Sequence, residues 1–491
     1  MKTDKNSATD IKNETDIDVA ADKSSAIDKN AAQDKKSERA NMLGTRPVGS
    51  LLLKFAIPSI VAMLVSALYN MVDQIFIGNV VGELGNAATN IAFPFSALCT
   101  AIALMFGIGG SAAFNLTVGS GDKKTAGYYV GNALVSMVSL GIILTTVAEI
   151  FMPWLLTLFG STADILPYAV EYTRITAAGF PILILSIGGG HLIRADGKPT
   201  VAMICNLAGA ITNTALDALF VMVFKWGMAG AAIATVIGQT VAAGLVVYHI
   251  AHFRTVKLTK EHFRVRRKYV LYEAGLGMSQ GFNQLAMMLV QIVLNNSLKY
   301  YGAKSIYGEN IPIAVVGVIS KVNMMYFSFC IGISQGMQPI ASFNYGAKNY
   351  RRTREAYLRA VTAGATISMI AFLLFHFFPR QITSVFGKGS EEYFQFAINY
   401  FRIYLFATFI NNIQPLTSNF FSAIGKPKTG LFLSLTRQIL FLLPLILIFP
   451  IAWGIDGIMY AGPIADGMAF IVSMIFVVRE LSKGQYKLQK V

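Results

Sequence analysis

The chain contains few charged residues and very few cysteines. Only 14% of its 491 residues are charged, whereas soluble proteins carry about 25%. This shortage excludes a large water-facing surface. The three cysteines, Cys99, Cys205 and Cys330, lie far apart in apolar stretches, which excludes a disulfide framework and a paired-cysteine metal site. No paired-histidine zinc motif, phosphate-binding loop or nucleophile elbow occurs in the sequence. We therefore expect neither an enzyme nor a bound cofactor.

Apolar residues are abundant instead. They make up 54% of the chain, and the mean hydropathy is +0.54. The formal net charge of +15 does not indicate nucleic-acid binding, because the basic residues lie between apolar runs. Such a composition over this length predicts a membrane protein with many spans, in contact with the lipid bilayer.

The first 45 residues form a separate polar segment. Aspartates recur in it every six residues, at Asp4, Asp10, Asp16, Asp22, Asp28 and Asp34. A spacing of six fits neither a helical face nor a strand, and there are almost no large apolar side chains to bury. We expect residues 1–45 to be a disordered tail. The segment also lacks the pattern of a secretory signal.

Twelve apolar stretches long enough to cross a bilayer follow the tail, since a spanning helix needs about 20 such residues. They are residues 50–78, 86–114, 126–156, 166–192, 199–224, 229–252, 269–298, 311–343, 355–378, 394–422, 428–452 and 457–480. This predicts an all-α membrane protein with twelve transmembrane helices.

Basic residues predict the orientation of these spans. They concentrate in the loops after even-numbered spans and in the C-terminal tail, as at Lys123, Lys124, Arg254 to Lys268, Lys348, Arg351, Arg352, Arg354 and Arg479. By the positive-inside rule, these loops and both termini are cytoplasmic. The expected organisation is a first lobe at 46–252, a basic cytoplasmic linker at 253–268, a second lobe at 269–482 and a short cytoplasmic tail at 483–491.

The two lobes resemble each other in sequence. Glycines recur 227 residues apart in the pairs Gly109 and Gly336, Gly119 and Gly346, Gly227 and Gly454, and Gly230 and Gly457. A Gly-Lys-Pro turn also recurs, at 197–199 and 425–427. Because each half holds an even number of spans, both enter the membrane in the same direction. This predicts a parallel repeat of two six-helix lobes, as in transporters that move two bundles around a midplane site.

Polar residues inside the first lobe need an explanation, because a charge within a span costs about 2.5–3.5 kcal/mol. Asp73 lies in the first span, Asp217 in the fifth, with Asn213 one turn before it, and Thr235 in the sixth. Their oxygens could bind a proton or a small hard cation. Two structural alternatives remain: Asp73 meets water near the outer surface, and Asn213 joins two helices by a hydrogen bond. Pro58, inside the first span, could be an ordinary helix kink.

The second lobe contains a different charge group. Lys321, Arg437 and Asp466 lie within its apolar runs, and either cation could pair with Asp466. A structural buried ion pair is the interpretation we favour. The alternative is a charge relay or a contact with substrate.

Four motifs resemble the multidrug and toxic compound extrusion (MATE) transporters, and most closely their MepA-like branch. They are Leu68–Gly78, Arg194–Pro199, Asn213–Asp217 and Gly227–Thr235. The resemblance covers about residues 46–480. It implies V-shaped lobes that export large organic cations in exchange for inward H⁺ or Na⁺. It also implies a cation-coupling site at Asp73, Asn213, Asp217 and Thr235, a kink of the first span at Pro58 and a substrate-lining tyrosine at Tyr172.

The second lobe departs from one branch of this family. Members of the NorM-type branch carry carboxylates in the seventh and tenth spans, where this chain has amides, at Asn283, Gln284, Asn411 and Asn412. Coupling by acids of the second lobe is therefore not expected. These four amides are retained as candidates for lining the substrate path.

We therefore expect a secondary multidrug antiporter of the bacterial cytoplasmic membrane, with both termini inside and acting as a monomer, because each chain holds both lobes. Its expected partners are small organic cations and the bilayer, with no nucleic acid. A flippase of lipid-linked oligosaccharides is the alternative, although such proteins usually have more spans. A membrane-embedded prenyltransferase would need acidic Mg²⁺-binding clusters, which the sequence lacks.

Overall fold

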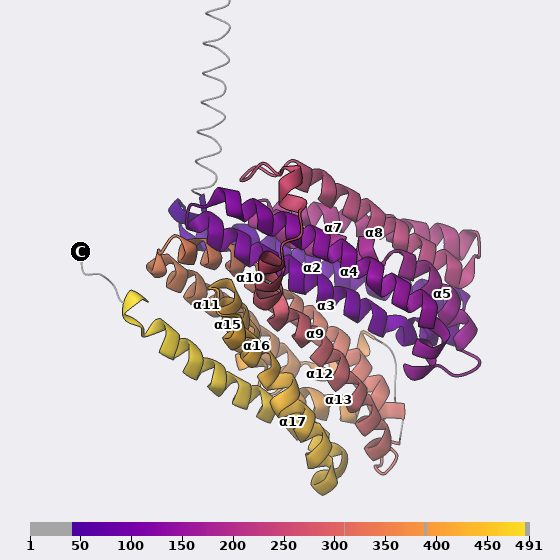
Figure 1. The fold of residues 1–491 in the computed structure, drawn as a ribbon. Helices are drawn as coiled ribbons and strands as arrows, with labels where there is room; N and C mark the ends of the chain where they lie inside the picture. The colour runs from indigo at the N-terminus through magenta and orange to yellow at the C-terminus, as the bar shows by residue number, and fades with distance from the viewer. Residues whose placement is uncertain (1–41, 309, 387–389, 487–491) are drawn as a thin grey trace, which may run out of the picture.

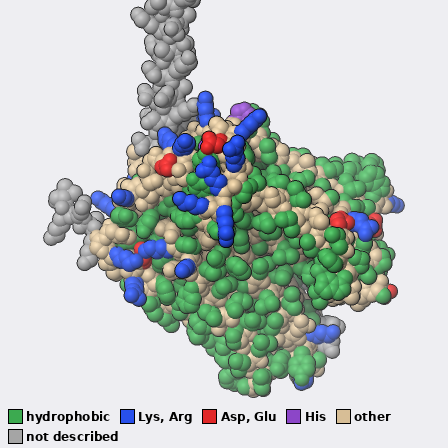
Figure 2. Space-filling model, viewed as in Figure 1, with side chains coloured by type: hydrophobic (Ala, Val, Ile, Leu, Met, Phe, Trp, Pro, Cys, Tyr) green, Lys and Arg blue, Asp and Glu red, His purple; other side chains and the backbone are tan. Residues whose placement is uncertain are grey.

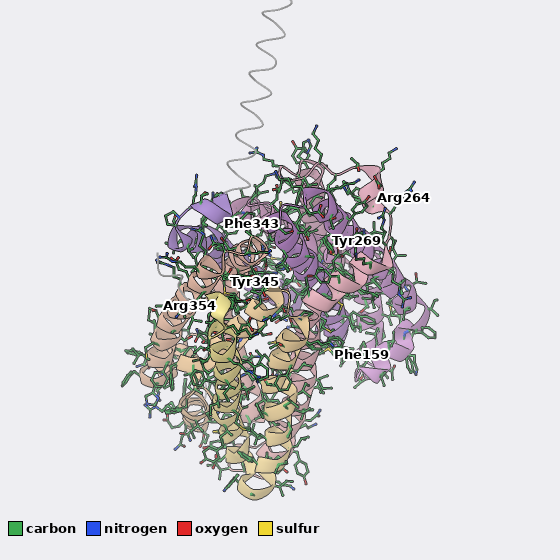
Figure 3. The ribbon with its side chains drawn as sticks, turned by 60° about the vertical axis from the view of Figure 1, so that its left-hand side comes forward. Phe159, Arg264, Tyr269, Phe343, Tyr345 and Arg354 are labelled. Atoms are coloured by element: carbon green, nitrogen blue, oxygen red, sulfur yellow. The ribbon has the colours of Figure 1, made fainter. Side chains whose placement is uncertain are left out.

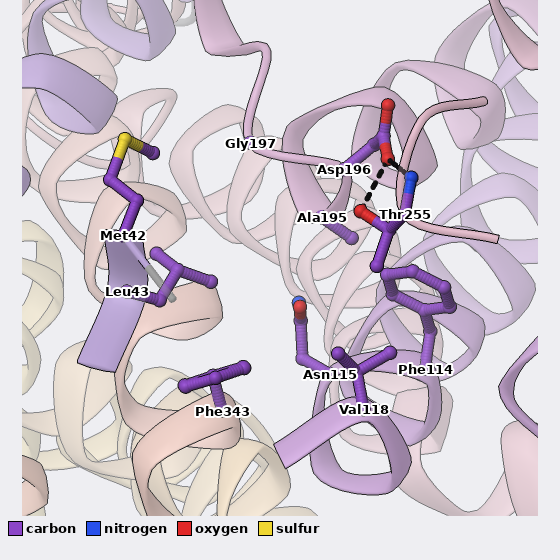
Figure 4. Close-up of a pocket in the computed structure, with 10 residues that line it drawn as sticks. All are labelled: Met42, Leu43, Phe114, Asn115, Val118, Ala195, Asp196, Gly197, Thr255 and Phe343. Atoms are coloured by element: carbon purple, nitrogen blue, oxygen red, sulfur yellow. Dashed lines mark hydrogen bonds between the residues drawn. The ribbon is translucent and has the colours of Figure 1, made fainter. Parts of the chain in front are cut away.

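The computed structural model describes residues 42–308, 310–386 and 390–486, and these ranges are helical with no strand. The fold class is thus the expected one. Of the predicted tail, only 42–45 are described. They form a helical turn in which Met42 and Leu43 are buried, so these four residues do not fit the predicted disordered segment, and residues 1–41 lie outside the described residues. The physical reason is that these two apolar side chains belong to the same buried apolar cluster as Phe343, with which they line one small pocket (Figure 4).

The first lobe consists of seven long helices and one π-helical turn. They are α2 (Val48–Val80), α3 (Glu83–Gly119), α4 (Lys123–Leu158), α5 (Leu166–Ala178), α6 (Phe180–Ala195), α7 (Pro199–Asp217), η1 (Ala218–Val223) and α8 (Gly227–Ala251). Helices α5 and α6 are bent by 56° relative to each other. The bend occurs at Gly179, just before Pro181, which has no backbone N–H to continue the helix.

The second lobe is more broken. It comprises α9 (Arg267–Gly302), α10 (Asn310–Gly346), α11 (Tyr350–Phe377), α12 (Pro379–Ser384), α13 (Glu391–Tyr404), α14 (Thr408–Asn411), α15 (Ile413–Ala423), α16 (Pro427–Leu435), η3 (Thr436–Leu442) and α17 (Leu443–Leu481). Gly454 adopts φ +58° and breaks α17 into two helices. Glycine has no Cβ, so it takes this angle without steric cost.

The predicted spans coincide with helices. Eight helices in the described ranges are long and apolar enough to cross a membrane, or nine if the bent pair α5 and α6 is one span. One of the eight, Pro427–Leu481, contains two predicted spans separated by the break at Gly454. The predicted spans 269–298 and 394–422 correspond to α9 and to the series α13 to α15. These two segments contain many amide side chains, which lower their mean hydropathy. They are therefore not among the helices that qualify as spans by length and composition alone.

The Gly-Lys-Pro turns fold alike in the two lobes. Gly197 and Gly425 have φ +78° and +77°, and the proline that follows each opens the next helix, α7 or α16. Proline suits a first helical position, because its missing N–H has no helical partner there. The matched turns agree with the internal repeat.

Loops after even-numbered spans gather at one end of the molecule. Residues from the start of the described chain, the end of α3, the loop between α6 and α7, the linker and the end of α10 line one small pocket there (Figure 4). On the face seen in Figure 2, most lysine and arginine side chains lie towards this end, and apolar side chains cover the rest. We call it the basic end. That the basic end faces the cytoplasm remains a prediction.

The two lobes meet near the basic end and diverge away from it (Figure 1). Helices α2 and α3 of the first lobe pack against α9 and α10 of the second. Glycines permit this close approach: a Cβ on Gly277 would lie 1.8 Å from the carbonyl oxygen of Met105, and one on Gly109 would lie 2.0 Å from that of Glu273. We call this contact of α2 and α3 with α9 and α10 the lobe seam.

Two of the four pairs of recurrent glycines lie at this seam. A Cβ on Gly336 would lie 2.7 Å from the amide nitrogen of Ala56, and Gly119 and Gly346 similarly face the opposite lobe. Gly109 and Gly336 therefore occupy matching places in the two halves. The repeat identified in the sequence is, in these positions, a repeat of contacts between backbones.

The basic linker between the lobes is docked on the first lobe. Asn132 of α4 donates to the carbonyl oxygen of His262 at 3.3 Å and accepts from the amide of Arg266 at 2.8 Å. Tyr128 of α4 donates to Glu261, and this hydrogen bond lowers the pKa of Glu261 below its usual value. The linker contains one short helix, η2 (Lys260–Phe263). Figure 3 shows Arg264 at the basic end and Phe159 far from it.

The start of the linker is tied to the loop between α6 and α7. Asp196 accepts hydrogen bonds from the backbone of Arg254 at 3.2 Å and of Thr255 at 3.0 Å, as Figure 4 shows for Thr255. Burial raises the pKa of Asp196, although the bonds from Thr255 and the charge of Lys198 oppose the rise. The linker is therefore held at several points along its length.

Candidate functional site

Three helices of the first lobe bring four polar side chains together. Asp73 comes from α2, Asn213 and Asp217 from the last turns of α7, and Thr235 from α8. The carboxyl groups of Asp73 and Asp217 lie within hydrogen-bonding reach of each other. The amide nitrogen of Asn213 donates to Thr235 Oγ1 at 3.4 Å. The structure thus brings together residues that have as many as four spans between them in the sequence.

Several oxygens in this cluster are buried without a hydrogen-bond donor. They are Asp73 Oδ1, Asn213 Oδ1 and both carboxyl oxygens of Asp217. Asp217 is fully buried, whereas Asp73 is only partly so. A buried polar atom without a partner costs about 1–3 kcal/mol, and more when it is charged. The arrangement is therefore one that gains free energy when a proton or cation joins it.

The alternatives raised for these residues can now be compared with their places. Asp73 lies seven residues before the end of α2, yet its Oδ1 is buried, so the side chain does not simply meet water at a helix end. Asn213 does join α7 to α8 through Thr235. Its Oδ1 still faces the cluster without a donor, so the structural bond uses only one half of the amide.

Two tyrosines complete the cluster. Tyr172 of α5, a candidate from the sequence, is near Asp73 and Asp217 and has its hydroxyl against Thr235. Tyr69 of α2 is also near both carboxyl groups, although it is not among the residues predicted from the sequence. It lies one helical turn before Asp73, so the spacing of four residues was the signal that could have identified it.

The helix that carries Asp217 changes its winding directly after it. Residues Ala218–Val223 form the π-helical turn η1. Such turns leave the regular hydrogen-bond ladder and are frequent at functional sites. In the second lobe, the π-helical turn η3 likewise contains Arg437.

Arg437 and Asp466 form a buried ion pair in the second lobe. Asn411 donates to Asp466 Oδ2 at 3.2 Å, so the carboxylate has two partners. Lys321 lies on the exposed surface of α10 and forms no ion pair within the described ranges. Of the two cations considered for Asp466, the structure therefore brings only Arg437 to it.

The other amide candidates lie in different places. Asn283 and Gln284 are half-buried on α9. Asn411 and Asn412 are buried within the second lobe, and Asn412 has no hydrogen-bond partner for either side-chain atom. None of the four is among the partners of the cluster around Asp217. Tyr172 is the only substrate-lining candidate that the described structure brings to that cluster.

Pro58 lies at the lobe seam rather than at the polar cluster. Helix α2 continues through it from Val48 to Val80. Its neighbours Ala56 and Ile60 touch Gly336 and Gly332 of α10. The kink expected at Pro58 remains a prediction. The same helix, however, carries both a seam contact and Asp73.

The site does not have the composition of a transition-metal centre. Within the described ranges, no group of three or more histidine, cysteine, aspartate or glutamate side chains lies together. The first-lobe cluster offers only oxygens, from two carboxylates, an amide, a hydroxyl and two phenols. Such ligands suit protons and hard cations.

Comparison with known proteins gives consistent results. The family profile MatE matches residues 58–219 and 281–448. The multidrug export protein MepA of Staphylococcus aureus (strain MRSA252) is 20% identical over 443 residues, which are 90% of this chain and 96% of the relative. MepA of Staphylococcus haemolyticus (strain JCSC1435) is 21% identical over 428 residues, covering 87% and 92%.

Solved structures share the fold. A structure described as the "outward-facing conformation of a multidrug resistance MATE family transporter of the MOP superfamily" aligns with a TM-score of 0.84 and 23% identity, covering 91% of this chain and 99% of the other. A MOP superfamily transporter from Pyrococcus furiosus Vc1 gives the same values. The twelve-helix, two-lobe architecture is therefore that of a known group of membrane proteins.

Proposed function

The chain belongs to the MatE family of multidrug efflux transporters, and on this premise we propose that it exports organic cations in exchange for inward H⁺ or Na⁺. The flippase alternative is not favoured, because the family match and the curated relatives belong to multidrug exporters. We further propose that the protein is a multi-pass protein of the bacterial cytoplasmic membrane and acts as a monomer.

The observation that supports this proposal is the pair Asp73 and Asp217, in which three of the four carboxyl oxygens are buried without a hydrogen-bond donor. Two carboxylates this close repel each other, so a proton or a cation between them is stabilising. Asn213 and Thr235 add neutral oxygens, which would complete the coordination of a Na⁺ ion or accept from a protonated acid. The same donor set is compatible with either ion.

Exchange requires that the coupling ion alter the affinity for drug. Helix α2 offers a physical route, because it carries Asp73 near one end and packs Ala56 and Ile60 against α10 near the other. Neutralising the acid pair removes a repulsion on α2 and lets it shift at Pro58. We propose that this shift lowers the affinity for drug and that loss of the ion restores it.

The test uses purified protein in liposomes and follows an ethidium-like cation under H⁺ and Na⁺ gradients imposed separately. Gradient-driven movement is expected in the wild type and should be lost in Asp217→Asn and in Asp73→Asn. Asp164→Asn is the matched control, because Asp164 is exposed between α4 and α5. It should transport as the wild type does.

Each outcome of this test bears on the proposal. The gradient that drives movement identifies the coupling ion. Movement that survives in both aspartate variants would overturn the first-lobe site. Absence of movement with every organic cation tried in the wild type would overturn drug export and return the flippase to consideration.

A further inference from the structure

A third acid, Glu273, is buried at the lobe seam and has no role in the proposed exchange. Its side chain is completely shielded from solvent, and neither carboxyl oxygen has a hydrogen-bond partner. It forms no ion pair within the described ranges. The other two buried acids of the second lobe differ in having partners: Asp466 has Arg437 and Asn411, and Glu480 has Lys426 and Lys483. Glu273 is thus a buried acid that nothing compensates.

The seam itself encloses Glu273. A Cβ on Gly109 would lie 2.0 Å from the carbonyl oxygen of Glu273, and, one turn further along α9, a Cβ on Gly277 would lie 1.8 Å from the carbonyl oxygen of Met105. The lobes are therefore in close backbone contact at Glu273 and one turn after it. Separating α3 from α9 removes that contact and admits water to the carboxyl group.

No cation faces Glu273 from the elements packed against α9. The segment of α3 from Met105 to Leu116 and all of α15 contain no titratable side chain. Helix α4 contributes the phenol of Tyr129, which is near enough to interact electrostatically with Glu273. Helix α9 itself contributes the phenols of Tyr269 and Tyr272.

The remaining charged groups of the packed elements are engaged or exposed. Arg437 of η3 pairs with Asp466, and Glu480 of α17 pairs with Lys426 and Lys483. Lys428 of α16, Arg479 of α17 and Lys321 of α10 are exposed. The thiol of Cys330 and the phenol of Tyr345 are the titratable groups on the half of α10 nearest the seam, and neither is a cation. An ionised Glu273 would therefore be buried without a counter-charge, which is strongly unfavourable.

We propose that Glu273 is a second proton-binding site, protonated while the lobes are closed at the basic end and deprotonated to water when the seam opens there. The proposal rests on the two-lobe exchange proposed above, but it concerns a separate group. The proton leaves the carboxylic acid for water on opening and returns before closure. No other reactant is needed.

The two proton sites lie near opposite ends of the molecule. Glu273 is six residues from the start of α9, or about 9 Å from the basic end at 1.5 Å per residue. Asp217 is the last residue of α7, which begins at that end with Pro199, and so lies about 27 Å away along its helix. Glu273 therefore exchanges its proton with the side that the basic end faces.

The sign of the pH dependence follows from linkage. The closed seam binds one more proton than the open seam, so acid favours closure and alkali favours opening at the basic end. For one proton, the ratio of closed to open molecules changes at most about tenfold per pH unit within the titrating range. Glu273→Gln keeps the shape of the acid without its charge, so it should hold the seam closed at every pH.

The first measurement is infrared absorption of the protein in lipid, without substrate or gradient. The protonated-carboxyl absorption near neutral pH should contain a component that is lost in Glu273→Gln, whereas any contribution from Asp73 and Asp217 should remain. Glu392→Gln is the matched control, because Glu392 is exposed on the first turn of α13, and it should leave the band unchanged. An unchanged band in Glu273→Gln would overturn the proposal.

The second measurement is the distance across the seam. Spin labels are placed at Lys123 and Arg351, both exposed at the basic end on opposite lobes, in a protein whose three buried cysteines are replaced. The separated population should grow with pH in the wild type and stay small in Glu273→Gln. A Glu273→Gln protein that titrates like the wild type would also overturn the proposal.

Repeating the distance measurement in Asp217→Asn separates the two proposals. The dependence on Glu273 should persist there, because no coupling-ion gradient is applied. If transport requires neither Asp73 nor Asp217, the exchange proposal fails while the seam titration stands. If the seam does not titrate, only the role of Glu273 fails.

Discussion

At the scale of single residues, the buried acids are of two kinds: some have a counter-charge and hydrogen-bond donors, and others have neither. Asp466 is neutralised by Arg437 and a hydrogen bond from Asn411. Asp217 and Glu273 are buried with both carboxyl oxygens unpartnered. A compensated pair contributes to architecture, whereas an uncompensated acid changes its surroundings whenever it gains or loses a proton.

The ion pair of the second lobe gives a stability prediction. Asp466→Asn leaves the Arg437 guanidinium buried without an anion, so the protein should lose about 3–5 kcal/mol of stability. Thermal unfolding in detergent measures this as a lower midpoint. The double variant Arg437→Met with Asp466→Leu should recover most of the loss, because well-packed apolar side chains replace a buried pair at little cost.

The double variant also distinguishes the two interpretations of this pair. If it is as stable as the wild type and transports in liposomes, the pair is structural, as we expect. Stability without transport would instead indicate a charge relay or a contact with substrate.

The docked linker gives a pH prediction. The hydrogen bond from Tyr128 lowers the pKa of Glu261 in the folded protein. A group with a lowered folded pKa stabilises fully above its unfolded pKa, about 4.3 for glutamate, and this contribution is lost as pH falls through the folded value. Protection of the linker from hydrogen exchange should therefore stay constant from neutral pH to about 5 and decline only in stronger acid.

Variants of two adjacent tyrosines check this linker prediction. Tyr128→Phe removes the donor to Glu261, so it should lower the protection at neutral pH and abolish the acid-dependent part. Tyr129→Phe is the control, because Tyr129 packs against Tyr269 and Tyr272 instead. Equal loss in both variants would contradict the assignment.

At the scale of elements, close helix contact depends on glycine at particular places. Helix α9 supplies a matched pair: Gly277 is in backbone contact with α3, whereas a Cβ on Gly275 would meet nothing within 4 Å. Gly277 and Gly275 lie two residues apart on one helix, yet only Gly277 stands where a larger side chain would clash.

This contrast gives an element-scale prediction. Gly277→Ala should force α3 and α9 apart at a cost of about 1–3 kcal/mol, typical of overpacking, and should shift the label pair at Lys123 and Arg351 towards separation. Gly275→Ala should leave the distances unchanged and can gain up to about 1 kcal/mol from helix propensity. Closed seams of equal population in both variants would contradict the role given to Gly277.

At the scale of the whole molecule, the fold is two bundles joined at one end. Contacts of the seam and the docked linker hold the basic end, while the lobes diverge away from it (Figure 1). The exchange proposed above requires the basic end to open. This requirement can be tested by preventing the basic end from opening.

A reducible crosslink across the seam should stop transport. Cysteines in place of Ser120 and Ala347, exposed residues next to the touching Gly119 and Gly346, would be joined by a flexible reagent. Cation movement in liposomes should fall to background and return on reduction. A crosslink from Ser120 to Lys124, within one lobe, is the control. Transport through the crosslinked seam would contradict alternating access at this end.

Much of the first-lobe site was predictable because its residues are conspicuous in their local context. Asp73, Asn213, Asp217 and Thr235 are polar groups in apolar runs, and the sequence predicts them together through a family resemblance. Glu273 was not identified as a site, because it stands near the end of a span, where a glutamate is ordinary. Its burial comes from α3, a segment more than 150 residues earlier in the chain.

The amino-acid sequence by itself determined the membrane environment, the spans and the internal repeat, because these follow from composition and spacing along the chain. The tertiary structure alone decided that Arg437 rather than Lys321 neutralises Asp466, that Tyr69 joins the acid pair and that Glu273 lies in a closed seam. Burial and pairing depend on how closely distant helices approach, and that distance is set by the packing of the whole bundle.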